Sequence, residues 1–366
     1  MIKFLDLYKQ DKLLHKSILK KIKKLIKKGD FILGKEVSLF ENNFKHFCGS
    51  NYAISCANGT DALTLALKSL DLPKNSEVLI PAMTYCSTAF SVFNAGLRPK
   101  LVDTELLKPT ICLMDLKKKI SKKTKVILPV HLYGSAANLS GIKRLIDKKK
   151  IFLIDDCAQA HGTYDDSIKS KLRKKIGSTT DISCFSLYPG KNLGAYGDAG
   201  IITTNNKNFY NKIRKLRNLG SEKKFIHDLI GMNSRLDSIQ AIILNEKLKR
   251  LNLLNAKRKI IAKRYNEEIQ NDKIRKINYS DSCVYHQYVI LAKDRNKLIK
   301  ILSKNNIQYG FHYPYSINQL NVFKKYFKKN KYKNAEILAK EGLSLPIDPN
   351  LTNKQISFII KTINGI

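Results

Sequence analysis

The fold of this chain is decided by the stretch Cys184-Phe185-Ser186-Leu187-Tyr188-Pro189-Gly190-Lys191-Asn192-Leu193-Gly194-Ala195-Tyr196-Gly197-Asp198-Ala199-Gly200. It begins in the apolar run 182–185 and ends in another, 199–203, and both runs are typical of buried strands. The proline and the glycines between them disfavour helix and sheet, so the sequence predicts a tight loop. Lys191 lies in this loop, where its amine can be desolvated and can form a Schiff base with an aldehyde. The alternative is a glycine-rich surface loop with one exposed lysine.

Segments typical of strands and helices alternate around this loop from residue 50 onward. Strands are predicted at 53–56, 78–80, 100–102, 125–130 and 151–154, and helices at 61–70, 87–95 and 141–148. The runs 126–130 and 151–154 are continuously apolar, as in strands that are buried on both faces. The pattern predicts an α/β fold in which a mainly parallel sheet is wrapped by helices over residues 30–235. Ligands of such sheets bind beyond the carboxyl ends of the strands.

The remaining segments indicate a second, smaller unit. An amphipathic helix is predicted at 9–28, and packing on the protein's own core is favoured over binding to a membrane surface. A long helical pattern covers 236–269, followed by a strand at 288–291 and helices at 295–304, 335–341 and 354–362. We therefore expect a large domain at 1–250, which includes the N-terminal helix, and a small α+β domain at 251–366.

The composition restricts the partners and the compartment. Lys and Arg total 67 against 30 Asp and Glu, a formal net charge of +37. The basic runs are spread along the whole chain, so we expect no nucleic-acid partner and some attraction of an anionic substrate. The seven cysteines form no Cys-X-X-Cys pair and no metal-site spacing, which indicates a reduced compartment and no metal. With no signal peptide and no membrane-spanning stretch, the protein is expected in the cytoplasm.

Two motifs at predicted strand ends carry polar groups that are suited to act together with Lys191. Asn58-Gly59-Thr60 opens a helix, where free N–H groups and a hydroxyl favour a phosphate. Asp155 and Asp156 end a buried strand, and one of these carboxylates is suited to keep a pyridine nitrogen protonated, with Gln159 near a ring hydroxyl. An ordinary helix cap is the alternative for each motif.

Two further motifs support the same kind of site. Tyr85 follows a strand and is placed to stack on a cofactor ring. Asn233 and Arg235 open the long helix, and both side chains suit an anion. A core aromatic and a helix cap are the alternatives for these two positions.

Together the motifs resemble the DegT/DnrJ/StrS nucleotide-sugar aminotransferases, a branch of the fold-type I, aspartate aminotransferase-like, pyridoxal phosphate enzymes. The resemblance runs from about Phe31 to the Leu345-Pro346 turn. It implies pyridoxal 5'-phosphate as the cofactor and a large sheet of the seven-stranded type. The motifs that carry it are 31–34 (FILG), 58–63 (NGTDAL), 130–134 (VHLYG), 156–162 (DCAQAHG), 188–194 (YPGKNLG) and 233–235 (NSR).

The resemblance also implies a role for each matched residue. Lys191 would bond to the cofactor and later move a proton, and Asp156 would pair with its ring nitrogen. The other implied contacts are Gln159 with the 3-hydroxyl, Gly59, Thr60, Ser186 and Asn233 with the phosphate, Tyr85 with the ring, and Tyr188, His312 and Tyr313 with the sugar. Asn233 would come from a second subunit, which implies a homodimer with shared active sites. One departure is Phe225, in the stretch 223–225, where the family pattern leads us to expect a tyrosine.

The implied reaction moves an amino group from glutamate to a ketone of a dTDP- or UDP-linked hexose, for amino-sugar and surface-glycan biosynthesis. Amination at C3 is favoured, because the residues around the lysine look more like those of C3 enzymes. One alternative is amination at C4 of a nucleotide-linked 4-keto-6-deoxyhexose. The other is a pyridoxal-binding regulatory protein without turnover. Relatives that catalyse dehydration carry histidine in place of the lysine, and Lys191 argues against that activity.

Overall fold

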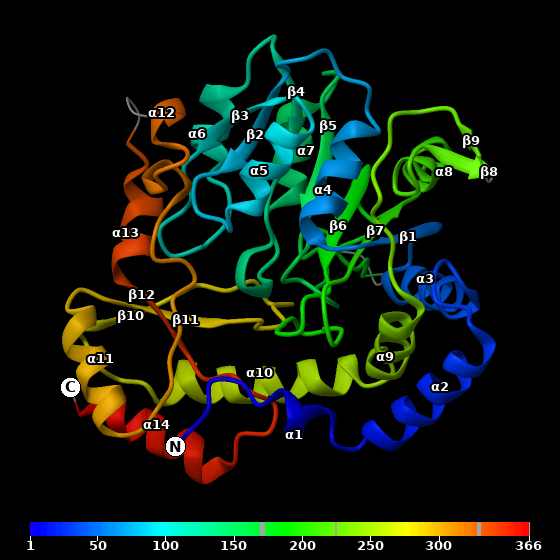
Figure 1. Cartoon of the computed structure of the whole chain (residues 1–366). Coiled ribbons are helices and arrows are strands. Elements are labelled where there is room, and N and C mark those ends of the chain that lie inside the picture. The colour runs from blue at the N-terminus through cyan, green and yellow to red at the C-terminus, as the bar shows by residue number, and fades with distance from the viewer. Residues whose placement is uncertain (169–172, 224, 328–330, 366) are drawn as a thin grey trace.

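A sheet of seven strands forms the centre of the molecule (Figure 1), in the order β1-β7-β6-β5-β4-β2-β3. The structure is a computed structural model that describes residues 1–168, 173–223, 225–327 and 331–365. The strands are β1 (Tyr52–Cys56), β2 (Glu77–Pro81), β3 (Arg98–Val102), β4 (Thr124–Ile127), β5 (Phe152–Asp156), β6 (Ile182–Ser186) and β7 (Gly200–Thr204). From β3 to β6 all neighbours pair in parallel, and β7 is antiparallel to β6 and β1. The predicted mainly parallel sheet is confirmed.

Helices cover both faces of this sheet. One face packs against α4 (Gly59–Lys68), α5 (Ser87–Asn94) and α8 (Lys207–Leu216). The other face packs against α3 (Lys35–Cys48), α6 (Leu113–Lys119), α7 (Leu139–Ile146) and α9 (Ser238–Leu248). Side chains of a strand alternate between these two cores: Ile127 and Leu153 belong to one, and Val126 and Ile154 to the other. This two-sided burial explains the continuous apolar runs of β4 and β5.

A smaller sheet with its own core follows in the sequence. Its strands are β10 (Ile274–Lys276), β11 (Tyr288–Ala292) and β12 (Gly342–Leu345), in the order β10-β11-β12. Its core includes residues of α10 (Leu251–Glu268), α11 (Arg295–Lys304) and α14 (Asn353–Asn364). Figure 1 shows α10 extending from α9 to this unit along one side of the molecule. Ile2 joins the same core, and the division at residue 250 stays a prediction.

The other elements are short or peripheral. The hairpin β8 (Ser221–Lys223) and β9 (Ile226–His227) projects beyond α8 in Figure 1. The short helices are η1 (Leu132–Gly134), η2 (Ile317–Gln319), α12 (Lys324–Phe327) and α13 (Lys333–Glu341). Within the described ranges, no helix combines the length and apolarity that crossing a membrane requires.

Two predicted long helices are each divided in the structure. Residues 9–28 fall into α1 (Leu7–Asp11) and α2 (His15–Lys28), and 236–269 into α9 and α10. The side chain of Asp6 caps α1 by accepting from the N–H of Lys9 (3.1 Å), and Asp11 at its end is ion-paired with Lys247 of α9 (Nζ–Oδ2 2.8 Å). Both charged side chains of this pair are at most 4 % exposed. Periodicity could not predict the break, because the partner of Asp11 is 236 residues away.

Candidate active site

A single cavity of about 810 Å³ brings together all the predicted site residues except Asn233. It lies where β5, β6 and the first turns of α4 and α5 converge, at the carboxyl ends of the parallel strands. Those residues are Gly59, Thr60, Tyr85, Asp156, Gln159, Ser186, Tyr188, Lys191, His312 and Tyr313. The cavity therefore joins the part predicted for a cofactor to the part predicted for a sugar.

Lys191 is held by the loop between β6 and β7. The loop closes on itself through Lys191 N–H to Tyr188 O (2.9 Å) and Ala195 N–H to Leu187 O (2.8 Å). Burial lowers the pKa of the Lys191 amine to about 8, although the negative charge of Asp156 opposes this shift. A large fraction of the amine is therefore neutral near pH 8, the form that can attack a carbonyl.

Asp156 ends β5 and faces the cavity. Its carboxylate accepts hydrogen bonds from Thr88 Oγ1 (2.9 Å) and from the N–H of Ala158 (3.1 Å). Its pKa is nevertheless raised, because burial outweighs these bonds and the positive charge of Lys191. The carboxylate therefore lacks a full positive counterpart, which a protonated ring nitrogen would supply.

Asp155 faces the opposite side of β5 and belongs to a closed network. It accepts from His131 Nε2 (3.1 Å) and Thr180 Oγ1 (2.6 Å), and these bonds help to keep its pKa low despite burial. With Cys157, the same His131 and Asp155 are close enough to surround a metal ion. Both imidazole nitrogens are already engaged, however, since Nδ1 accepts from the N–H of Ala137 (3.0 Å). The geometry thus favours Asp156 over Asp155 as the ligand-facing carboxylate.

Gln159 has a fixed orientation beside Asp156. Its Oε1 accepts from the N–H of Tyr133 (2.6 Å), and its Nε2 donates to the hydroxyl of Tyr313 (2.8 Å). The hydroxyl of Tyr133 in turn donates to the carbonyl of His312. These bonds connect the end of β5 to the 312–313 segment and leave one hydrogen of Gln159 Nε2 for a ligand.

The first turn of α4 forms an anion-binding niche. The side chain of Asn58 caps the helix by accepting from the N–H of Asp61 (2.8 Å), and the hydroxyl of Thr60 donates to Ser87 Oγ (2.8 Å). A Cβ on Gly59 would lie 2.6 Å from that of Ser186, so only glycine permits this close approach. Unpaired N–H groups of a helix start and two hydroxyls suit a phosphate.

The rings predicted to contact a cofactor and a sugar line the cavity. Tyr85 is 54 % exposed and Tyr188 is 57 % exposed, so both offer open ring surface to a ligand. Tyr85 lies near Tyr313 (ring centroids 5.3 Å apart), and His312 Nδ1 lies 2.8 Å from Ser344 Oγ. Burial lowers the pKa of His312 to about 4, which keeps its imidazole neutral at pH 7.

Asn233 does not line the cavity of its own chain. It is exposed and forms an isolated β-bridge with Asn218. Phe225 is also outside the cavity and is 82 % exposed, and position 224 of the stretch 223–225 is outside the described residues.

Sequence reasoning missed several side chains of the site. Thr88 orients Asp156, and Ser87 pairs with Thr60. Both lie in the first turn of α5, two and three residues after the predicted Tyr85. Their position just beyond a predicted strand is the signal by which they could have been found. Phe4 and Leu5 also line the cavity, although no motif links the first residues of the chain to Lys191.

The residues present fit pyridoxal phosphate. The structure provides a lysine amine of lowered pKa, a buried carboxylate that lacks a positive counterpart, and a phosphate niche in one cavity. Two exposed aromatic rings, Tyr85 and Tyr188, border the same space. This donor set matches an anionic, aldehyde-bearing aromatic cofactor.

Comparisons with known proteins agree with this class of site. The model of the DegT/DnrJ/EryC1/StrS aminotransferase family matches residues 12–364. A dTDP-3-amino-3,6-dideoxy-alpha-D-galactopyranose transaminase from Aneurinibacillus thermoaerophilus is 36% identical, over 100% of this chain and 99% of its own length. A UDP-N-acetyl-3-dehydro-alpha-D-glucosamine 3-aminotransferase from Acidithiobacillus ferrooxidans is 35% identical, over 96% and 94%.

A solved structure indicates the same class of protein. The crystal structure of S. venezuelae DesV in complex with a ketimine intermediate has a TM-score of 0.95 and 31% identity, covering 100% of this chain and 98% of that one. The fold and site thus define a pyridoxal phosphate-dependent aminotransferase. The chain belongs to the DegT/DnrJ/EryC1/StrS aminotransferase family. Because the matching family model and these two relatives are named as aminotransferases, the alternative of a regulatory protein without turnover is not favoured.

We expect Asp156→Asn to lower kcat by about a hundredfold, or about 2.7 kcal/mol in barrier. A neutral amide cannot hold a ring nitrogen protonated, yet the folded protein should still bind the cofactor. Asp155→Asn is the matched control, because it changes the neighbouring carboxylate that faces away from the cavity. It should reduce the thermal midpoint while kcat stays within about threefold. The interpretation is wrong if steady-state kinetics give Asp156→Asn the smaller loss in kcat.

The pH dependence of cofactor uptake should report the lowered pKa of Lys191. The protonated amine is not nucleophilic, so uptake of pyridoxal phosphate by the cofactor-free protein should accelerate with pH and level off above about 8. In Asp156→Asn the plateau should begin at lower pH, because the carboxylate favours the protonated amine. The measurement is stopped-flow absorbance. A rate that keeps rising to pH 10 would show that the amine has an ordinary pKa.

Proposed function

We propose that the protein transfers the amino group of glutamate to the C3 ketone of a dTDP- or UDP-linked hexose. The observation that carries this proposal is the single cavity, which joins Lys191, Asp156 and the α4 niche to Tyr188, His312 and Tyr313. The two curated relatives carry names that specify a 3-amino product or a 3-dehydro substrate on dTDP or UDP. Amination at C4 of a 4-keto-6-deoxyhexose is the alternative.

In the proposed reaction, the protein's own residues hold the reacting groups in position and move a proton. Pyridoxal phosphate, when bound, supplies the electron sink that makes the substrate's proton labile. Lys191 Nζ, neutral in part at pH 8, takes and returns that proton. Asp156 holds the negative charge that favours a protonated ring nitrogen, and Thr88 and the Ala158 N–H keep the carboxylate in place. Gln159, whose Oε1 accepts from the N–H of Tyr133, would donate from Nε2 to the 3-oxygen of the ring.

Recognition of the sugar is proposed for Tyr188, His312 and Tyr313. Tyr188 precedes Lys191 by three residues, and Tyr313, whose hydroxyl accepts from Gln159 Nε2, lines the same cavity. His312, neutral at pH 7, lies beside Tyr313. Groups on two sides of the reacting carbon can hold the hydroxyls that flank a C3 ketone, which is how a site rejects a regioisomer.

A second subunit is proposed to complete the site. The hydroxyl of Ser234 donates to Asp61 Oδ2 (2.6 Å) and accepts from the N–H of Ala57 (3.1 Å), so Ser234 faces its own chain's phosphate niche. Asn233 is exposed and Arg235 Nη1 donates to Asn218 Oδ1 (3.2 Å), and neither residue lines the cavity of its own chain. This supports a homodimer with shared active sites.

Offering a 3-keto and a 4-keto isomer with glutamate tests the reaction and its regiochemistry. With dTDP- and UDP-linked forms of each, we expect kcat/KM for one 3-keto sugar to exceed that for its 4-keto isomer at least tenfold, by mass spectrometry of the amino sugar. Lys191→Ala is the control and should aminate neither isomer, since it lacks the amine. Faster amination of the 4-keto isomer would overturn the regiochemistry alone. Amination of no keto sugar would overturn the proposed function.

Subunit mixing tests the shared site. Lys191→Ala and Asn233→Ala chains should each be impaired, and mixing them should restore activity. In a mixed dimer one of the two sites then has Lys191 from one chain and Asn233 from the other. The matched control mixes Lys191→Ala with Asp156→Asn, in which every site retains one defect and activity should not return. Proven subunit exchange without recovery in the first mixture would assign Asn233 to its own chain or outside the site.

A further inference from the structure

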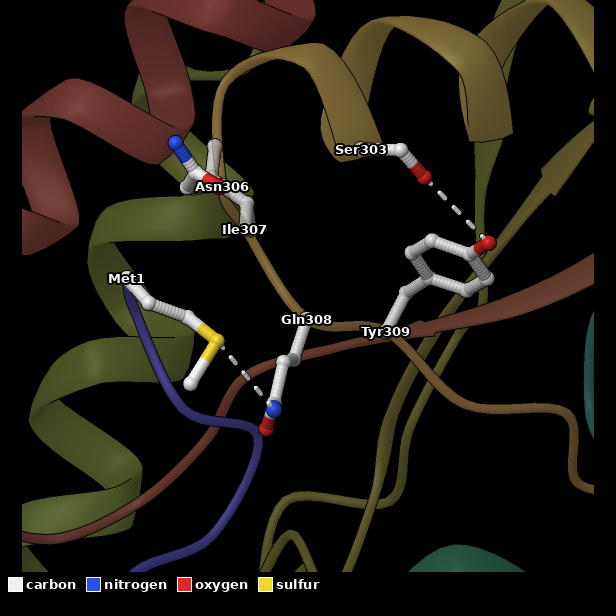
Figure 2. A pocket seen from close by; sticks show the side chains of 6 residues that line it. All are labelled: Met1, Ser303, Asn306, Ile307, Gln308 and Tyr309. Atoms are coloured by element: carbon white, nitrogen blue, oxygen red, sulfur yellow. Dashed lines mark hydrogen bonds between the residues drawn. The ribbon is translucent and has the colours of Figure 1, made fainter.

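The N-terminal segment 1–6, called the strap below, is fastened to the smaller unit at several points. The backbone of Ile2 pairs with residues 306–308, through its N–H to Asn306 O (2.8 Å) and through Gln308 N–H to Ile2 O (2.9 Å). Figure 2 shows Met1 beside Gln308, with Sδ 3.7 Å from Gln308 Nε2. Further along, the N–H of Phe4 donates to Gln308 Oε1 (2.8 Å). The strap ends where the N–H of Asp6 donates to Asp348 Oδ2 (2.7 Å).

This anchoring brings Phe4 and Leu5 to the wall of the active-site cavity. The ring of Phe4 is stacked on that of His312, with centroids 5.8 Å apart and an interplanar angle of 17°. A Cβ on Gly190 would lie 4.0 Å from Leu5 Cδ2, so Leu5 reaches the turn that holds Lys191. The strap thus extends between the two groups of residues assigned to the sugar, the 312–313 segment and the loop after β6.

A hexose needs an apolar wall as well as hydrogen-bond partners. Its hydroxyls lie around the edge, while its faces present C–H groups, which favour contact with aromatic and aliphatic side chains. Asp156 and Thr60 give the cavity a polar lining, whereas Phe4 adds carbon surface beside His312 and Leu5 beside Gly190. Stacking by Phe4 also restricts the His312 ring, whose Nδ1 lies 2.8 Å from Ser344 Oγ.

We propose that the strap is part of the substrate site, with Phe4 and Leu5 forming the apolar wall for the hexose ring and Phe4 positioning His312. This inference rests on the proposed function. It assigns the strap to the nucleotide sugar and not to the cofactor or glutamate. Loss of the Phe4 ring should therefore weaken sugar binding and leave the first half of the reaction unchanged.

Kinetics of Phe4→Ala test this assignment. We expect KM for the keto sugar to rise about tenfold, with kcat within about threefold and the absorbance change on adding glutamate alone unaltered. Phe4→Tyr keeps the ring and should restore KM to within about twofold. Tyr8→Ala is the matched control, because Tyr8 is an aromatic residue four positions further on, 69 % exposed, whose ring lies 5.0 Å from His15 and not in the cavity.

The chain contains no tryptophan, so Phe4→Trp introduces a single fluorescent reporter into the strap. Titrating this holoenzyme with the amino-sugar nucleotide that the wild type forms should change its fluorescence, and the nucleotide without sugar should change it much less. Tyr8→Trp should respond to neither. Equal responses at both positions, or an unchanged KM in Phe4→Ala, would overturn the inference. A wild type that aminates no keto sugar would instead overturn the proposed function on which it rests.

Discussion

The half-buried amine of Lys191 and the buried carboxylate of Asp156, which carry opposite charges, impose the constraint on which the rest of the structure depends. Desolvation disfavours the charged form of each, lowering the pKa of the lysine and raising that of the aspartate, while each charge counteracts the shift of the other. A buried charge without its partner is strongly destabilising. The fold must therefore hold both groups at one place, and a cofactor that carries both an aldehyde and a basic ring nitrogen uses each of them.

The order of the strands in the sheet brings both groups to the same edge. β5 and β6 are parallel neighbours, with Asp156 opposite Cys184, so Asp156 and the loop after β6 emerge at the same edge. β7 returns antiparallel beside β6, which forces the intervening loop to turn back over that edge. Asn192 then ties the loop to the smaller unit, donating from Nδ2 to Asn255 Oδ1 (2.9 Å) and Val284 O (3.1 Å). The position of Lys191 is thus determined by contacts from both units.

The sequence predicted the strands and site residues that depend on patterns of neighbouring residues. Continuous apolar runs identified β4 and β5, and the positions of Lys191, Gln159 and Thr60 followed from motifs at strand ends, all of which line the cavity. Contacts between segments that are far apart in the sequence could not be predicted from it. Neither the Asp11–Lys247 pair at the end of α1 nor the stacking of Phe4 on His312 has a signal in the neighbouring residues. Strand alternation separates Asp155 from Asp156, because Ile154 and Asp156 share a face, but the structure was needed to show which face carries the cavity.

The charges around the cavity give an independent reason to expect a second subunit. Among its described lining residues, Lys191 is the single lysine or arginine, against the carboxylates of Asp61, Asp156 and Asp198. A cofactor phosphate and a nucleotide diphosphate would add negative charge to a space that has little positive charge of its own. The net charge of +37 is spread over the chain, and beyond about 10 Å such exposed charges are largely screened at ordinary salt. We therefore expect further cations and donors to be supplied from close by. Asn233 and Arg235, which lie outside the cavity of their own chain, have the chemistry to supply them from a partner.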